Sequence, residues 1–236
     1  MIKKLIPQKL INYLKIKLGV PSQKSSLTKL KNLGFEPKNI LDIGAYEGNW
    51  GIEIAEIFPE AHILMIEGQR SKEDKLLKIA KNLKNAEVLI ALLGAEVKMV
   101  NFNIYETASS VFTENNVTNA KIEEVQLNLL DDILENQYTN AIDFIKIDTQ
   151  GYELEILKGG LKTLHNAQAV LLEVSLLNIY NDAPLVDQVM AFMSENGYAL
   201  YDICTLMPRP YDKALFQSDF LFLKKDHLLR SSSRWD

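Results

Sequence analysis

Short apolar runs rich in Ile, Leu and Val alternate with helix-like patterns from Asn39 to Leu223, and this feature restricts the fold most strongly. Such runs predict buried strands, and strands that alternate with helices predict a parallel sheet covered by helices. We predict strands at residues 40–43, 62–67, 87–93, 144–148, 169–174, 198–203 and 219–223. We predict helices at residues 49–58, 71–83, 152–164 and 184–196. The chain is therefore expected to form a three-layer, doubly wound α/β fold around a mostly parallel seven-stranded sheet.

Two stretches fit this alternation less well. Residues 97–105 alternate weakly after Gly94, which predicts a small hairpin or an extension of the sheet. Residues 106–128 are rich in Thr, Asn and Ser, so we interpret them as a long loop that contains Ser109 and Ser110. Beside a binding site such a loop would recognise substrate, and elsewhere it would be a surface excursion.

The composition is that of an ordinary globular protein. The chain has 236 residues, of which 47% are hydrophobic and 24% charged, so one domain is long enough to bury a core. Cys204 is the single cysteine, which excludes an intramolecular disulfide and favours a reducing, cytoplasmic location. No apolar run approaches the ~18 residues that a membrane-spanning helix needs.

Basic residues concentrate at the start of the chain. Eight Lys precede Glu36, the first acidic residue, so residues 1–35 carry a charge of +8. The remaining residues have 18 basic and 31 acidic side chains, a net charge of −13. We therefore predict a basic N-terminal segment (1–35), a main domain (36–225) and a C-terminal tail (226–236). The acidic main domain argues against a nucleic-acid partner.

Within the basic segment, apolar residues recur every four positions from Ile2 to Leu18, which is the spacing of an amphipathic helix. The Lys residues between them exclude a secretory signal peptide. Two interpretations stay open. Residues 1–20 either make a peripheral contact with an anionic inner membrane face, or form a helix that packs on the domain.

A glycine turn follows the first predicted strand. Gly44 and Gly48 lie at the junction between this strand and a helix, where free backbone N–H groups meet a ligand. Asp42 suits a cationic ligand, and Glu67 at the end of the next strand is placed to accept both hydroxyls of a ribose. We therefore favour an S-adenosylmethionine site over a purely structural turn. The predicted cofactor-binding residues are Asp42, Gly44, Ala45, Gly48, Asn49, Glu67, Gly68 and Leu92.

A second motif is longer and more specific. Residues 143–160, with the sequence DFIKIDTQGYELEILKGG, are similar to the pattern D-x-I-K-I-D-x-x-G-x-E-x-x-x-L-x-G of the FkbM methyltransferases. The segments 130–134, 171–174 and 197–198 also resemble that family. The resemblance implies a class I methyltransferase fold with an antiparallel last strand. Tyr46 departs from the pattern, because the family's first motif usually has Asn there.

The resemblance implies O-methylation of a hydroxyl, which needs a base or a polarising metal ion. Asp148 and Glu173 end the fourth and fifth predicted strands and are the predicted catalytic residues. Their roles stay open. They share Mg²⁺, or Asp148 acts as base while Glu173 holds a substrate hydroxyl, or both only contact the cofactor and cap helices.

Two functions from different classes follow. The first is an S-adenosylmethionine-dependent O-methyltransferase acting on a sugar hydroxyl of a glycan, glycolipid or related metabolite. The alternative is an inactive methyltransferase-like module that binds the cofactor and serves as a scaffold. The absence of G-x-G-x-x-G disfavours a nucleotide-sugar oxidoreductase. Acceptor choice is expected to depend on loops 106–128 and 176–184.

Overall fold

The computed structural model describes residues 17–104, 111, 121–138, 140–233 and 235. Its central sheet is built from β1 (Asn39–Ile43), β2 (His62–Glu67), β3 (Ala86–Ile90), β7 (Phe144–Ile147), β8 (Ala169–Ser175), β9 (Tyr198–Ile203), β10 (Met207–Pro208) and β11 (Leu215–Lys224). The order is β3-β2-β1-β7-β8-β11, and both β9 and the short β10 pair with β11. The pairs from β3 to β8 are parallel, whereas β11 is antiparallel to β8. The predicted mostly parallel sheet and its antiparallel last strand are confirmed, but the short β10 makes it eight strands instead of the predicted seven.

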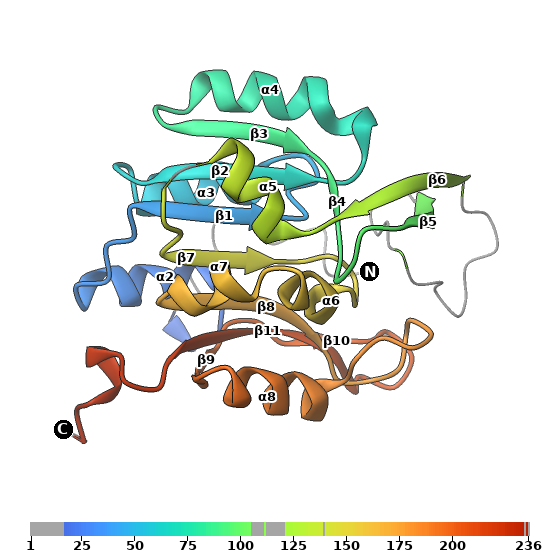
Figure 1. Ribbon diagram of the computed structural model, residues 1–236. Coiled ribbons are helices and arrows are strands. Elements are labelled where there is room, and N and C mark those ends of the chain that lie inside the picture. The colour runs from blue at the N-terminus through green and yellow to red at the C-terminus, as the bar shows by residue number, and fades with distance from the viewer. Residues whose placement is uncertain (1–16, 105–110, 112–120, 139, 234, 236) are drawn as a thin grey trace, which may run out of the picture.

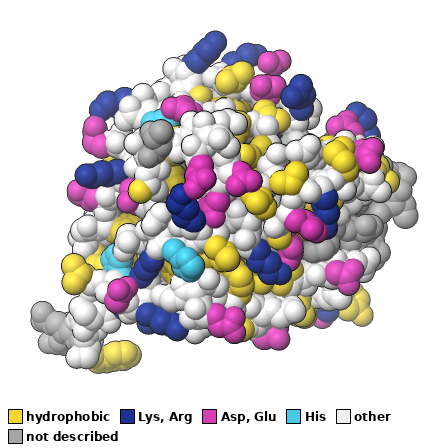
Figure 2. Space-filling model, viewed as in Figure 1, with side chains coloured by type: hydrophobic (Ala, Val, Ile, Leu, Met, Phe, Trp, Pro, Cys, Tyr) yellow, Lys and Arg dark blue, Asp and Glu magenta, His cyan; other side chains and the backbone are white. Residues whose placement is uncertain are grey.

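Helices cover both faces of this sheet, which confirms the three layers (Figure 1). One face carries α2 (Gln23–Asn32), α3 (Asn49–Ile57) and α4 (Glu73–Asn82). The other carries α5 (Leu130–Gln137), α6 (Glu153–Lys158), α7 (Leu161–Asn166) and α8 (Val186–Glu195). Short 3₁₀ turns lie at Arg70–Lys72 and Leu228–Arg230. Consecutive residues of a strand pack against opposite helix layers, as Ile40 and Leu41 do, because side chains alternate across a strand. On the face seen in Figure 2, acidic and basic side chains are interspersed.

A small second sheet extends from the end of the third predicted strand. That strand divides into β3 and β4 (Leu92–Leu93), and β4 leaves the main sheet to pair with β6 (Lys121–Asn128). The antiparallel partner of β6 is β5 (Met99–Ile104), so the weakly alternating stretch contains a strand, but this strand belongs to the second sheet and does not extend the main one.

The prediction of one loop over 106–128 is wrong for its last part, where β6 lies. This strand fully buries only Leu127 and leaves Ile122 60% exposed, so its hydrophobic alternation is weak. Residues 105–110 and 112–120, with Ser109 and Ser110, lie outside the described residues.

The single helix predicted over 152–164 is two helices, α6 and α7, separated by Gly159 and Gly160. A Cβ atom on Gly159 would lie 2.0 Å from the carbonyl oxygen of Gly94. The break therefore lets the backbone approach the start of the second sheet, which no local pattern reveals.

The basic segment contributes to the core. Ser22 caps α2 through a capping box with Ser25, and Leu27 and Leu30 of this helix are buried. The predicted boundary at residue 36 therefore does not separate residues 23–35 from the domain. Most of the predicted amphipathic helix lies outside the described residues. Within the described part of the chain, no helix is long and apolar enough to cross a bilayer.

Candidate functional site

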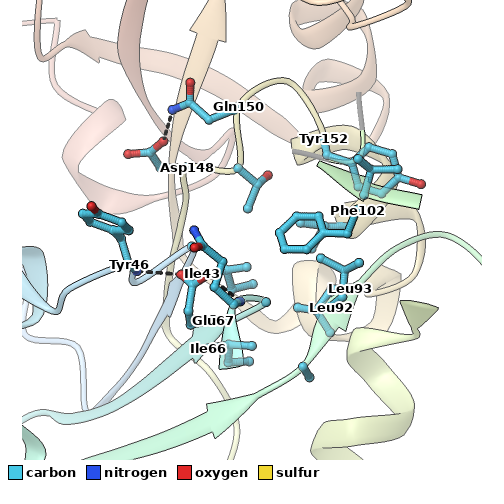
Figure 3. Close-up of a pocket in the computed structure, with 17 residues that line it drawn as sticks. Ile43, Tyr46, Ile66, Glu67, Leu92, Leu93, Phe102, Asp148, Gln150 and Tyr152 are labelled. Carbon is cyan, nitrogen blue, oxygen red and sulfur yellow. Dashed lines mark hydrogen bonds between the residues drawn. The ribbon is translucent and has the colours of Figure 1, made fainter. Parts of the chain in front are cut away.

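A cavity of about 180 Å³ opens at the carboxyl ends of β1, β2 and β7 (Figure 3). This is the edge at which open α/β sheets bind ligands. The lining residues are Ile43, Gly44, Tyr46, Ile66, Glu67, Gly68, Gln69, Ala91, Leu92, Leu93, Phe102, Val111, Asp148, Thr149, Gln150, Tyr152 and Ile156.

The turn after β1 brings the backbone of Gly44 against the end of β7. Gly44 has φ +74°, in the left-handed region that favours glycine. A Cβ atom there would lie 1.9 Å from the carbonyl oxygen of Asp148. The N–H groups of Gly44 and Ala45 both donate to the carbonyl oxygen of Ile66, at 2.9 and 3.1 Å. Glycine thus permits a direct contact between two strand ends at the cavity wall.

The Glu67 carboxylate joins the loops that follow β1 and β2. Its Oε2 accepts a hydrogen bond from the N–H of Tyr46 at 2.7 Å, and its Oε1 accepts one from the N–H of Gln69 at 2.8 Å. The residue is 6% exposed. Burial raises the pKa of Glu67, and the two backbone hydrogen bonds oppose that rise. Glu67 is therefore a fixed acceptor group at the cavity, and its contact with a ribose stays a prediction.

The predicted cofactor residues divide into two sets. Gly44, Glu67, Gly68 and Leu92 line the cavity, whereas Asp42, Ala45, Gly48 and Asn49 do not.

Two of these residues have packing roles. Ala45 is buried in the core. Gly48 has φ +76°, and a Cβ atom on it would lie 2.9 Å from Cδ1 of Ile79 in α4. Gly48 therefore allows close packing between the start of α3 and α4. Asn49 is exposed.

Asp42 is fully buried and forms an ion pair with Lys146 of β7. Lys146 Nζ lies 2.9 Å from Asp42 Oδ1, and it also donates to the carbonyl oxygen of Gly44 at 3.2 Å. Asp42 Oδ2 has no hydrogen-bond partner among the described residues. Burial alone would lower the pKa of Lys146, but the Asp42 and Asp148 carboxylates outweigh it and raise that pKa.

Gln150 bridges the two carboxylates that the sequence predicts to be catalytic. Its Nε2 donates to Asp148 Oδ1 and to Glu173 Oε2, both at 3.0 Å. Gln217 Nε2 donates to the same Glu173 oxygen at 2.9 Å, and the Tyr180 hydroxyl donates to Gln150 Oε1. The structure brings Asp148 and Glu173 into one network, but only Asp148 lines the cavity.

The two carboxylates have different surroundings. The Asp148 side chain is 36% exposed, with its Oδ2 4.0 Å from Lys146 Nζ. Burial raises the pKa of Glu173 well above its ordinary value, and the negative charge of Asp148 adds to this rise. Burial and the Asp148 charge therefore both favour the protonated form of Glu173 over its carboxylate.

Glu153 shapes the loop that carries Asp148 and Gln150. Its Oε1 accepts hydrogen bonds from the N–H groups of Thr149 and Gly151, at 2.8 and 3.1 Å. Burial raises the pKa of Glu153 to about 7. Glu153 therefore holds the loop of the motif in place.

Apart from Leu92, sequence reasoning missed the apolar wall of the cavity. Phe102 comes from β5 and Leu93 from β4, while Tyr152 and Ile156 come from the region of α6 (Figure 3). Thr149 and Gln150 lie inside the quoted motif and could have been found there. Phe102 gives no such signal, because the second sheet brings it to the site.

Within the described part of the chain, no group of three or more His, Cys, Asp or Glu side chains is arranged to hold a metal ion. Gln150 Nε2 lies between the two predicted metal ligands, and an amide donor does not fit a shared cation.

Comparisons with solved structures relate this fold to known proteins. An FkbM methyltransferase from Methylobacillus flagellatus is 16% identical with a TM-score of 0.52, covering 78% of this chain and 43% of that one. The present chain thus spans less than half of that protein. Aeropyrum pernix fibrillarin in complex with S-adenosyl-L-methionine is 13% identical with a TM-score of 0.52, covering 85% and 74%.

M. capricolum TrmK in complex with S-adenosyl-homocysteine is also 13% identical with a TM-score of 0.52, covering 87% of this chain and 70% of that one. These likenesses confirm the class I methyltransferase fold. Curated protein sequences give no match. A model of the methyltransferase FkbM domain matches residues 42–200, well over half of the chain. The chain therefore belongs to the FkbM methyltransferase family.

Proposed function

We propose that this protein is an S-adenosylmethionine-dependent methyltransferase that methylates a hydroxyl group, with a sugar of a glycan, glycolipid or related metabolite as acceptor. One observation carries the proposal. A single cavity brings together the Gly44 turn, the fixed Glu67 carboxylate and the partly exposed Asp148.

The cavity suits the nucleoside part of this cofactor. Each Glu67 oxygen accepts one backbone N–H, which leaves acceptor capacity for the two ribose hydroxyls. Leu92, Phe102 and Ile156 offer apolar surface for the adenine ring. The absence of a side chain at Gly44 lets its backbone contact the end of β7 at the cavity wall. Fibrillarin and TrmK, which share the fold, were solved with this cofactor or its product.

When bound, the cofactor supplies a methyl group on a positively charged sulfur. Asp148 is the base in our proposal. The acceptor hydroxyl would lie against Asp148, whose carboxylate would take its proton as the methyl group is transferred to the oxygen and S-adenosylhomocysteine is released. Glu173 does not line the cavity, so in this proposal it positions Asp148 through Gln150. This choice replaces the predicted shared Mg²⁺ site, whose donor set does not fit.

The acceptor class rests on the family resemblance and on charge. The net charge of −13 after residue 35 disfavours a polyanionic nucleic acid as substrate. A lipid-linked sugar would bring its hydroxyl to the protein at a membrane surface, which agrees with the basic amphipathic pattern of residues 1–20. Membrane contact and a cytoplasmic location stay predictions.

A scaffold that binds the cofactor without turnover is the second candidate. Turnover assays with labelled S-adenosylmethionine and a panel of sugars, glycolipids and tRNA distinguish the two, with NMR assignment of the methylated atom. Label transfer to a sugar oxygen is the expected result. Tight binding of S-adenosylhomocysteine without transfer to any acceptor would favour the scaffold, and transfer to a base nitrogen would overturn the acceptor class.

A further inference from the structure

Lys146 lies beneath the cavity, at the centre of the sheet, and does not line it. Its side chain is 5% exposed. Burying an ammonium group is costly, and a buried ion pair is often no more stabilising than apolar side chains of similar volume. Apart from Asp42, its register partner on β1, the neighbouring strand positions on this face are apolar, as Phe144 and Leu171 show. The charge therefore calls for a reason other than stability.

The contacts of Lys146 converge on the elements that form the cavity. Nζ lies 2.9 Å from Asp42 Oδ1 and donates to the backbone oxygens of Gly44 and Ile43, at 3.2 and 3.5 Å. It also lies 4.0 Å from Asp148 Oδ2, on the same strand end. The Trp50 ring of α3 covers it, with the ring centre 5.7 Å from Nζ.

Gly44 and Asp148 already touch through their backbones, because Gly44 has no side chain. Lys146 Nζ also contacts both residues, through a hydrogen bond to the Gly44 carbonyl oxygen and a charge interaction with the Asp148 carboxylate. Its positive charge also opposes the rise that burial imposes on the pKa of Glu67, Glu173 and Asp219. The buried Lys146 ammonium group thus interacts both with the Gly44 turn, at the proposed cofactor site, and with Asp148, the candidate base.

We propose that Lys146, held by Asp42, is a positioning residue that sets the Gly44 turn against Asp148 and thereby couples cofactor binding to methyl transfer. The inference rests on the proposed function. It assigns Asp42 a role as counter-ion of Lys146. A direct contact between Asp42 and the cofactor is not required.

The test compares three variants with the full-length protein. Lys146→Met leaves Asp42 buried and unpaired, so it is expected to be destabilised. The double variant Asp42→Leu with Lys146→Met replaces the pair by apolar side chains and is expected to regain stability. Tyr198→Phe is the control, because its buried hydroxyl donates to the carbonyl oxygens of Leu164 and Ala167, which do not line the cavity.

Binding of S-adenosylhomocysteine is measured by calorimetry, stability by thermal unfolding, and kcat and KM for the acceptor by label transfer. The double variant should unfold near the wild-type temperature, yet bind at least about tenfold more weakly and lose at least about tenfold in kcat. Its acceptor KM should change less than about threefold. Tyr198→Phe should keep wild-type binding and kcat.

Wild-type binding and kcat in a stable double variant would overturn the proposal. So would an equal loss in Tyr198→Phe, because the effect would then follow stability alone. If the double variant fails to fold, Lys146→Met assayed below its unfolding temperature must show the same losses, and normal values there overturn the proposal. A wild-type protein that neither binds S-adenosylhomocysteine nor transfers methyl groups refutes the proposed function itself.

Discussion

Substituting Gly44 by Ala tests the contact on which the site is built. An Ala at φ +74° costs about 1–2 kcal/mol of backbone strain. Its Cβ would also start 1.9 Å from the Asp148 carbonyl oxygen, whereas real Cβ contacts stay above 3.0 Å. Relieving that overlap costs about 1–3 kcal/mol more, as overpacking of a core does. The free energy of unfolding should therefore fall by about 2–5 kcal/mol.

The same overlap has a kinetic consequence. Gly44 and Asp148 must separate by about 1 Å, and a misplacement of that size can cost about 100-fold in rate. We expect kcat of Gly44→Ala to fall about 100-fold, together with weaker binding of S-adenosylhomocysteine. Stability is measured by urea unfolding, and kcat by label transfer.

Gly197→Ala is the matched control for this variant. Gly197 has φ +85° in the turn before β9, and a Cβ atom there would have no heavy atom within 4 Å. This variant should therefore lose only the strain energy of about 1–2 kcal/mol and keep its kcat. Equal losses of stability and activity in the two variants would refute the argument from the Gly44 contact.

Three further outcomes are expected. Between its ordinary pKa of 4.5 and its folded-state value of about 7, Glu153 keeps its proton in the folded protein and loses it in the unfolded chain. The free energy of unfolding should thus fall by about 3 kcal/mol as pH rises through this window. Urea unfolding measured at several pH values should show this fall for the wild type and not for Glu153→Gln. The same pH dependence in both proteins would contradict the prediction. Asp148→Asn should lose at least about 100-fold in kcat and bind S-adenosylhomocysteine normally, whereas a matching loss of affinity would place Asp148 in cofactor binding. EDTA should leave the rate of methyl transfer unchanged. Inhibition by EDTA that Mg²⁺ reverses would instead support the shared metal site.

The sheet and the positions of its strand ends could be predicted, because both depend on local patterns. Apolar runs marked β1, β2, β7 and β8, and Glu67 and Asp148 followed at their tips. The second sheet could not be foreseen as a wall of the site. Its strand β6 leaves Ile122 exposed, so tertiary pairing with β5 rather than hydrophobic periodicity defines it.

The sequence also could not predict which side chains contact one another in the folded protein. Asp42 in a glycine-turn motif indicates a ligand contact, but the side chain turns to Lys146, 104 residues away in the chain. The bridge from Gln150 to Glu173 also depends on strand order, since β7 and β8 are neighbours only in the folded sheet. Such contacts are non-local, and a single sequence carries no direct record of them.

The central claim is that the cavity at Glu67 binds the nucleoside part of S-adenosylmethionine. Calorimetric titration with S-adenosylhomocysteine of the wild type, Glu67→Ala and the control Glu60→Ala tests it directly, because Glu60 is exposed and pairs only with Lys84 among the described residues. We predict saturable binding by the wild type and Glu60→Ala, and a loss of at least about 100-fold in affinity for Glu67→Ala, about 3 kcal/mol. Equal affinities in all three proteins would contradict the account.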